Sequence, residues 1–186
     1  MVNLIVEKAV EFYKRMDKEY SPLIRAEAYS EGGTKFWVIY LDDKKILSIF
    51  PRKDDGIERL NLMFWLGEFL CRQSFYHDNE EVYDKVSFLL ACHIYMYKYV
   101  LPLLKGFRHI VYSLEFHYLT PITGDFYADA TIWDKKDDWL LFFHFDQLGG
   151  VHYHFVYHEG SLQGIWTPQA RSKVYTYLKS VLFSRI

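Results

Sequence analysis

The chain lacks the cysteine spacing, the basic runs and the long apolar segments that mark several classes of protein. Of its 186 residues only Cys71 and Cys92 are cysteines, and no second Cys or His lies near either at zinc-finger spacing. We therefore expect two buried free thiols in a reducing compartment. The net charge of −2, without a run of Lys and Arg, argues against nucleic acid as a partner. The most apolar segment is interrupted by His93 and Lys98 and closed by Pro102, so it falls short of the ~20 residues that a membrane span needs.

Acidic and basic residues follow the first four positions in alternation, which is untypical of a signal or transit peptide, and we expect a cytoplasmic protein. Hydrophobic residues make up 51% of the chain and aromatic residues 19%. A chain of this length and composition favours a single domain over residues 1–186 with a sizeable core. The aromatic share suits apolar tunnels and ordinary core packing equally well.

Helical spacing of apolar residues recurs in several segments. It predicts an amphipathic helix over residues 2–18, within an N-terminal helical extension of residues 1–30. The pattern of residues 56–74 favours a second helix, although Phe64-Trp65-Leu66 also fits a strand. Thr167 followed by Pro168 provides a cap and a first-turn proline for a C-terminal helix over residues 167–186.

One further helix is predicted to lie in the interior. Asp78 and Glu81 form a start resembling a capping box, and the helix that they open runs from about Asn79 to Leu101. Because nearly every face of this helix is apolar, other elements must cover it on all sides.

Alternating patterns predict strands over residues 35–40 and 45–50, and four more after the interior helix, over residues 109–119, 125–133, 139–146 and 151–158. No crossover helix separates the last four, so they form an antiparallel sheet. Their apolar faces need a partner, and we expect Leu114, Phe116, Ala128 and Ala130 to face the helix that contains Leu89.

The segment joining the first two of these four strands reads Phe-His-Tyr-Leu-Thr-Pro-Ile-Thr-Gly-Asp, from Phe116 to Asp125. Pro121 ends the strand because it lacks an N–H donor, and Gly124 supplies the permissive backbone for the return. This segment, following a buried helix, resembles the hotdog fold of acyl-CoA thioesterases and dehydratases, whose members commonly carry Phe-Leu-x-Pro-x-x-x-Gly-Asp. The resemblance covers about residues 35–158 and implies a sheet that wraps around the central helix.

The resemblance also implies a ligand and a reaction, namely an acyl-CoA thioester bound in an apolar tunnel and hydrolysed there. Leu89, Phe116 and Ala128 would line the tunnel. Hydrolysis needs a base that activates water, and the candidates are Asp84 and His93 on the helix. Many catalytic members place a His-Gly-Gly turn before this helix, and residues 75–79 contain none.

Each candidate base also has a structural interpretation. Asp84 can be a solvated residue that interacts favourably with the helix dipole, and His93 can be a buried histidine bonded to a tyrosine or a carbonyl group. Glu68, a third candidate, can be an exposed residue of the preceding helix. A non-catalytic module that binds an acyl chain or builds an assembly is therefore the alternative function.

Histidines on the last strands raise a third possibility. His152 and His154 project from one face of a strand, and His117 and His144 lie on neighbouring strands. Two histidines at this spacing can ligate zinc, iron or manganese. A covered sheet face uses the same alternation, and we expect neither a metal nor another cofactor.

Together these patterns predict an α+β protein, with a hotdog-like antiparallel sheet around a central helix and with additional N-terminal and C-terminal helices. The expected strand edges and the habit of the fold favour a homodimer. The predicted function is binding and hydrolysis of acyl-CoA or another acyl thioester.

Overall fold

The computed structural model of the protein describes residues 1–77, 80–120 and 122–184. The elements found in these residues are α1 (Val2–Met16), β1 (Ile24–Glu31), β2 (Thr34–Leu41), β3 (Lys44–Asp54), β4 (Ile57–Leu66), β5 (Phe69–Tyr76), α2 (Glu81–Tyr99), a 3-10 helix η1 (Leu101–Leu104), β6 (Ile110–Tyr118), β7 (Phe126–Asp134), β8 (Trp139–Asp146), β9 (Val151–Tyr157), β10 (Gly160–Ile165) and α3 (Pro168–Phe183). The predicted α+β class is therefore confirmed.

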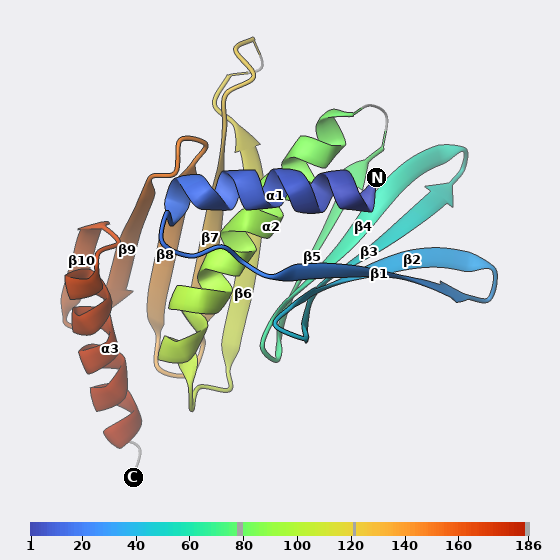
Figure 1. The fold of residues 1–186 in the computed structure, drawn as a ribbon. Coiled ribbons are helices and arrows are strands. Elements are labelled where there is room, and N and C mark those ends of the chain that lie inside the picture. Colours follow the sequence, from blue (N-terminus) through green and yellow to red (C-terminus); the bar gives the residue numbers. More distant parts are fainter. Residues whose placement is uncertain (78–79, 121, 185–186) are drawn as a thin grey trace.

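The strands form two antiparallel meanders of five strands each within the described part of the chain. The N-terminal sheet has the order β1-β2-β3-β4-β5, and the C-terminal sheet has the order β10-β9-β8-β7-β6. Helices α1 and α2 cross in the space between the two curved sheets, and α3 lies beside β9 and β10 (Figure 1). In each half of the chain, a helix thus precedes a five-stranded meander.

Helix α2 is the centre of the core, as its sequence predicts. Twelve of its residues, among them Leu89 and His93, are buried. Leu114, Ala128 and Ala130 are completely buried in the same core, and Phe116 contacts Phe88 of α2 with ring centroids 6.3 Å apart. The predicted packing of the C-terminal sheet on this helix is confirmed.

The predicted helix over residues 56–74 is wrong, because these residues form strands β4 and β5 with a turn at Gly67. Strand β4 is apolar on both faces, so its alternation is hard to see in the sequence. Buried and half-buried positions alternate along it: Leu60, Leu62, Phe64 and Leu66 are buried, and Asn61, Met63 and Trp65 are half-buried. Glu68 consequently lies in a turn and not on a helix.

Two further segments differ from expectation. The proposed helical extension over residues 1–30 contains strand β1 after α1, and the sequence pattern missed β10. Strand β10 has glycines at both Gly160 and Gly164 and lies at the edge of its sheet, so it lacks the apolar alternation that identifies an inner strand.

The two sheets meet at strands β5 and β6 without a backbone ladder between them. The Gln73 side chain of β5 instead donates a hydrogen bond to the carbonyl oxygen of Leu114 on β6. The resemblance to the hotdog fold implied one wrapped sheet, and the structure divides the strands into two sheets around the helix.

Several local predictions can be compared with the structure. The Thr167 side chain accepts a hydrogen bond from the backbone N–H of Ala170 at 3.1 Å, so the predicted cap of α3 is confirmed. Gly124 has φ +71°, the left-handed conformation that favours glycine at the β6–β7 connection. The predicted roles of Asp78 and Pro121 concern positions outside the described residues.

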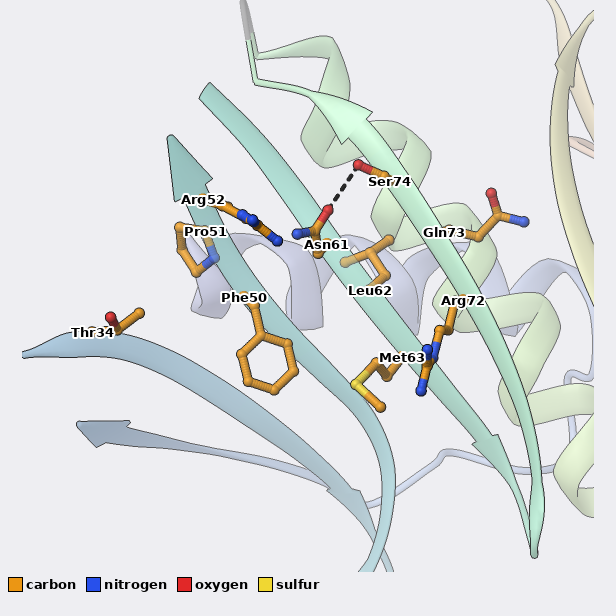
Figure 2. A pocket seen from close by; sticks show the side chains of 10 residues that line it. All are labelled: Thr34, Phe50, Pro51, Arg52, Asn61, Leu62, Met63, Arg72, Gln73 and Ser74. Atoms are coloured by element: carbon orange, nitrogen blue, oxygen red, sulfur yellow. Dashed lines mark hydrogen bonds between the residues drawn. The ribbon is translucent and has the colours of Figure 1, made fainter. Parts of the chain in front are cut away.

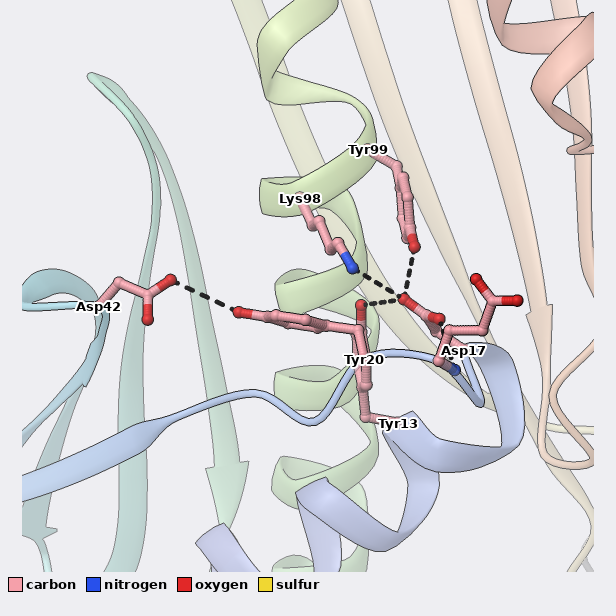
Figure 3. Close-up of polar contacts among 7 residues, drawn as sticks. Tyr13, Asp17, Tyr20, Asp42, Lys98 and Tyr99 are labelled. Carbon is pink, nitrogen blue, oxygen red and sulfur yellow. Dashed lines mark hydrogen bonds and ion pairs between the residues drawn. The ribbon is translucent and has the colours of Figure 1, made fainter.

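Helices α1 and α2 are joined by a cluster of polar side chains around Asp17 (Figure 3). The Asp17 carboxylate accepts hydrogen bonds from the hydroxyls of Tyr99 at 2.5 Å and Tyr13 at 3.0 Å, and the Lys98 ammonium lies 3.3 Å away. The side chain of Asp17 is only 9% exposed. Burial opposes its ionisation, but the three donors outweigh burial and keep the pKa of Asp17 below its usual value.

Replacing Asp17 by Asn should lower the free energy of unfolding at pH 7 by about 1–3 kcal/mol, because the tyrosines and the lysine lose their charged acceptor. The lowered pKa means that this stabilisation is complete above the unfolded-state pKa of roughly 3.9 and is lost as the pH falls through the lower folded value. Urea titrations across this range test both effects. Asp42→Asn is the matched control, since among the described residues Asp42 receives only an exposed contact from Tyr20 at 3.5 Å, and equal losses in the two variants would contradict the prediction.

Candidate functional site

A pocket of about 400 Å³ lies at the N-terminal end of α2, where the β6–β7 connection passes the helix. The residues that line it come from the first two turns of α2, the end of β6, the β6–β7 connection and the start of β7: Glu81, Asp84, Lys85, Phe116, Tyr118, Gly124 and Phe126. Two of the side chains predicted from the sequence, Asp84 and Phe116, therefore lie in one pocket beside the central helix.

The pocket has an aromatic wall that continues into the core. Phe126 packs against Phe116 and against Phe88 of α2, with ring centroids 5.2 and 4.9 Å apart. Phe12 of α1 contacts Phe88 and Phe126 from the other side, at 5.3 and 5.8 Å. The apolar wall is thus built from rings of four elements, namely α1, α2, β6 and β7.

The rim of the pocket is charged. Lys8 of α1 donates to the Asp84 carboxylate at 2.5 Å, and both side chains are partly exposed, at 33% and 47%. The Lys85 ammonium lies 5.1 Å from the centre of the Tyr118 ring, and the Tyr118 hydroxyl donates to Glu81 at 3.4 Å. Asp84 is therefore a paired but accessible carboxylate that borders an apolar wall.

His93 lies elsewhere, inside the core. Its ring is completely buried, with Nδ1 2.8 Å from the Tyr112 hydroxyl and Nε2 2.9 Å from the carbonyl oxygen of Trp65. Burial lowers the pKa of His93 to about 4, although hydrogen bonds with backbone groups act in the opposite direction. Neutral His93 therefore links α2 to β4 and β6, and the structure does not bring it together with Asp84.

The remaining predicted positions are also separate from the pocket. Leu89 and Ala128 are completely buried and pack within the core, without lining the α2 pocket. Glu68 lies in the β4–β5 turn and lines a different hollow beside η1.

The histidines of the C-terminal sheet lie on the face turned away from α2. Asp129 is 3.0 Å from Nδ1 of His144 and 3.8 Å from Nε2 of His117, and Tyr127 packs between the two imidazole rings. His152 is opposite His144 on the neighbouring strand, and His154 is opposite Phe142. No group of three or more His, Cys, Asp and Glu side chains in the described part of the chain has a geometry suited to a metal ion.

Comparisons with protein-family models, with curated proteins and with solved structures find no match for this chain. None of the helices in the described segments has the length and apolarity required to cross a membrane. The function must therefore be inferred from the chemistry of the pockets.

Sequence reasoning missed four residues of this pocket region: Lys8, Lys85, Tyr118 and Phe126. Lys8 belongs to the polar face of the amphipathic N-terminal helix, and nothing in the sequence indicates that this face reaches Asp84, 76 residues away. Tyr118 and Phe126 pair directly across β6 and β7, so the strand ends flanking the Pro-x-x-Gly-Asp segment were the available signal.

His93 provides a test of the core. His93→Ala should destabilise the protein by about 2–4 kcal/mol, because it opens a cavity and leaves the Tyr112 hydroxyl and the Trp65 carbonyl without their partner. The folded-state pKa of about 4 lies below the unfolded value of roughly 6.5, so the wild type loses stability as the pH falls through this interval.

Thermal or urea unfolding between pH 7.5 and 4 measures both effects, and the variant should have a weaker pH dependence. His152→Ala removes an exposed histidine and serves as the control. A His93 variant as stable as this control, with an unchanged pH profile, would show that the buried histidine does not stabilise the core.

Proposed function

We propose that the protein binds an acyl thioester, with the acyl chain in the pocket at the N-terminal end of α2. The observation that carries the proposal is an aromatic wall beside the central helix with a carboxylate and a lysine at its rim. A volume of about 400 Å³ falls within the ~300–1,000 Å³ of typical ligand pockets. Each buried methylene of an acyl chain contributes roughly 0.8 kcal/mol, so a chain of moderate length suffices for binding.

A hotdog-like arrangement and a homodimer belong to the same proposal. Two curved antiparallel sheets around one buried helix support the hotdog-like arrangement, since hotdog proteins bind acyl thioesters beside such a helix. The edge strands β1 and β10 support the homodimer, because the outer backbone groups of an edge strand can pair with a strand of a second copy.

Hydrolysis of the bound thioester is the second candidate function, favoured by the position of Asp84 in the same pocket as Phe116. In this reaction Asp84 accepts a proton from water while the water oxygen attacks the carbonyl carbon. The carbon–sulfur bond then breaks, and the departing thiolate takes up the proton. The sequence offered Asp84 and His93 as the general base. Because His93 is enclosed in the core, only Asp84 of these two can reach the bound thioester.

The binding proposal is tested with S-decyl-CoA, a thioether that cannot be hydrolysed. Tyr118→Ala should raise its Kd at least about tenfold, equivalent to roughly 1.4 kcal/mol, because one wall of the pocket is lost. Isothermal titration calorimetry gives this value directly. Tyr175→Ala on α3 is a matched control, since Tyr175 is 42% exposed and Tyr118 is 39% exposed. Absence of binding to the wild type, or equal Kd values for the two variants, would overturn the proposal.

The hydrolysis candidate is tested by free-thiol release from acyl-CoAs of several chain lengths. Asp84→Asn should reduce the rate by at least about 10²-fold if Asp84 is the general base. Lys8→Gln breaks the same ion pair but keeps the carboxylate, so it should retain most of the activity. Equal losses in both variants would assign Asp84 a structural role. Absence of turnover at every chain length would leave the protein as a binding module.

A further inference from the structure

A second pocket, of about 760 Å³, lies on the face of the N-terminal sheet turned away from the helices. In Figure 2 the helices are behind the strands, and the side chains of the pocket project from β3, β4 and β5. Nine of its ten lining residues occupy three neighbouring strands, among them Phe50, Arg52, Asn61, Met63, Arg72 and Ser74. We call this hollow the outer groove.

The strand register sets the order of the side chains in the outer groove. Met63 pairs directly with Arg72 across β4 and β5, and Asn61 pairs with Phe50 on one side and Ser74 on the other. These two rows are adjacent, because alternate residues of a strand point to the same face. Met63 therefore lies next to the Arg72 guanidinium, and Phe50 lies on the other side of Met63, as Figure 2 shows.

The charge of the outer groove is positive and only partly neutralised. Arg52 pairs with Asp54 at 2.9 Å, and the Asn61 amide oxygen accepts a hydrogen bond from the Ser74 hydroxyl at 2.8 Å. Arg72 is exposed, and no ion pair or hydrogen bond of its guanidinium is found among the described residues. A guanidinium presents several N–H donors in a planar fork, which matches a carboxylate or a phosphate.

We propose that the outer groove binds an amphipathic anion, with a carboxylate or phosphate group on Arg72 and an alkyl chain along Met63 and Phe50. The position of Met63 between Phe50 and the unpaired Arg72 guanidinium carries this inference. The site is independent of the α2 pocket, with which it shares no lining residue.

The aromatic rings on this face favour an alkyl chain over a nucleic acid base. Phe36 stacks between Tyr29 and Phe50, with interplanar angles of 19° and 24° and centroids 5.5 and 5.0 Å apart. These contacts cover both faces of Phe36 and one face each of Tyr29 and Phe50, which leaves fewer ring faces to stack on bases as in single-strand recognition. Arg25 on the same face is paired with Glu27 and Asp43, which lowers its availability to phosphate groups.

The test compares decanoate and decyl phosphate with decanol, acetate and inorganic phosphate by calorimetry. We expect the two amphipathic anions to bind at least tenfold more tightly than decanol, and acetate and inorganic phosphate to bind at least tenfold more weakly than their decyl counterparts. Affinity that does not differ between decanoate and decanol, or between decyl phosphate and inorganic phosphate, would overturn the proposal.

Variants locate the site. Arg72→Gln should weaken decanoate binding at least tenfold, and Met63→Gln, a change of similar volume, should weaken it several-fold. The control Arg108→Gln alters another exposed arginine, and Tyr118→Ala alters the α2 pocket; neither should change the affinity. If Tyr118→Ala weakens decanoate binding and Arg72→Gln does not, the anion binds in the α2 pocket, and the proposal for the outer groove is refuted. Because Tyr118→Ala reports on the α2 pocket and Arg72→Gln reports on the outer groove, the two proposals fail separately.

Discussion

The architecture depends on the burial of a helix that is apolar on nearly every side. Helix α2 can remain folded in water only if other elements cover its whole circumference, because exposing its apolar side chains costs about 1.5–3 kcal/mol for each large residue. A single five-stranded sheet covers one side of a helix. The N-terminal sheet, the C-terminal sheet and α1 together enclose α2, and Phe64, Phe88 and Tyr13 each contact a side chain across one of these interfaces.

Polar contacts then fix the arrangement that burial alone leaves open. His93 has partners on β4 and β6, and it thereby connects both sheets to the helix. Asp17 connects the end of α1 to the last turn of α2. Apolar packing tolerates small rotations, whereas these hydrogen-bonded groups have few acceptable positions in a buried environment, so they specify the register of helix against sheet.

The sequence was sufficient to identify the interior helix, strands β6 to β9 of the C-terminal meander and both terminal helices, since each has a strong period or a strong cap. It was insufficient for β4, because Met63 and Trp65 are apolar residues on the outer side of a strand whose inner side is apolar as well. Met63 is also part of the outer groove. The alternation that identifies a strand is therefore weak in β4, where a proposed binding surface replaces the usual polar face. Functional surfaces are where rules for reading structure from sequence are expected to fail.

The candidate site was predictable only in part, for a related reason. Asp84 and Phe116 could be chosen from the chain, but Lys8 and Phe126 reach the same pocket through the packing of α1 and β7, which no local pattern encodes. The resulting charges distinguish the two pockets. At the α2 rim Lys8 and Lys85 offset Glu81 and Asp84, so this rim has no net positive charge that would attract a free carboxylate or phosphate, while the neutral carbonyl of a thioester is tolerated there. An anionic head group is instead attracted to Arg72 in the outer groove, so the two surfaces select different forms of an acyl ligand.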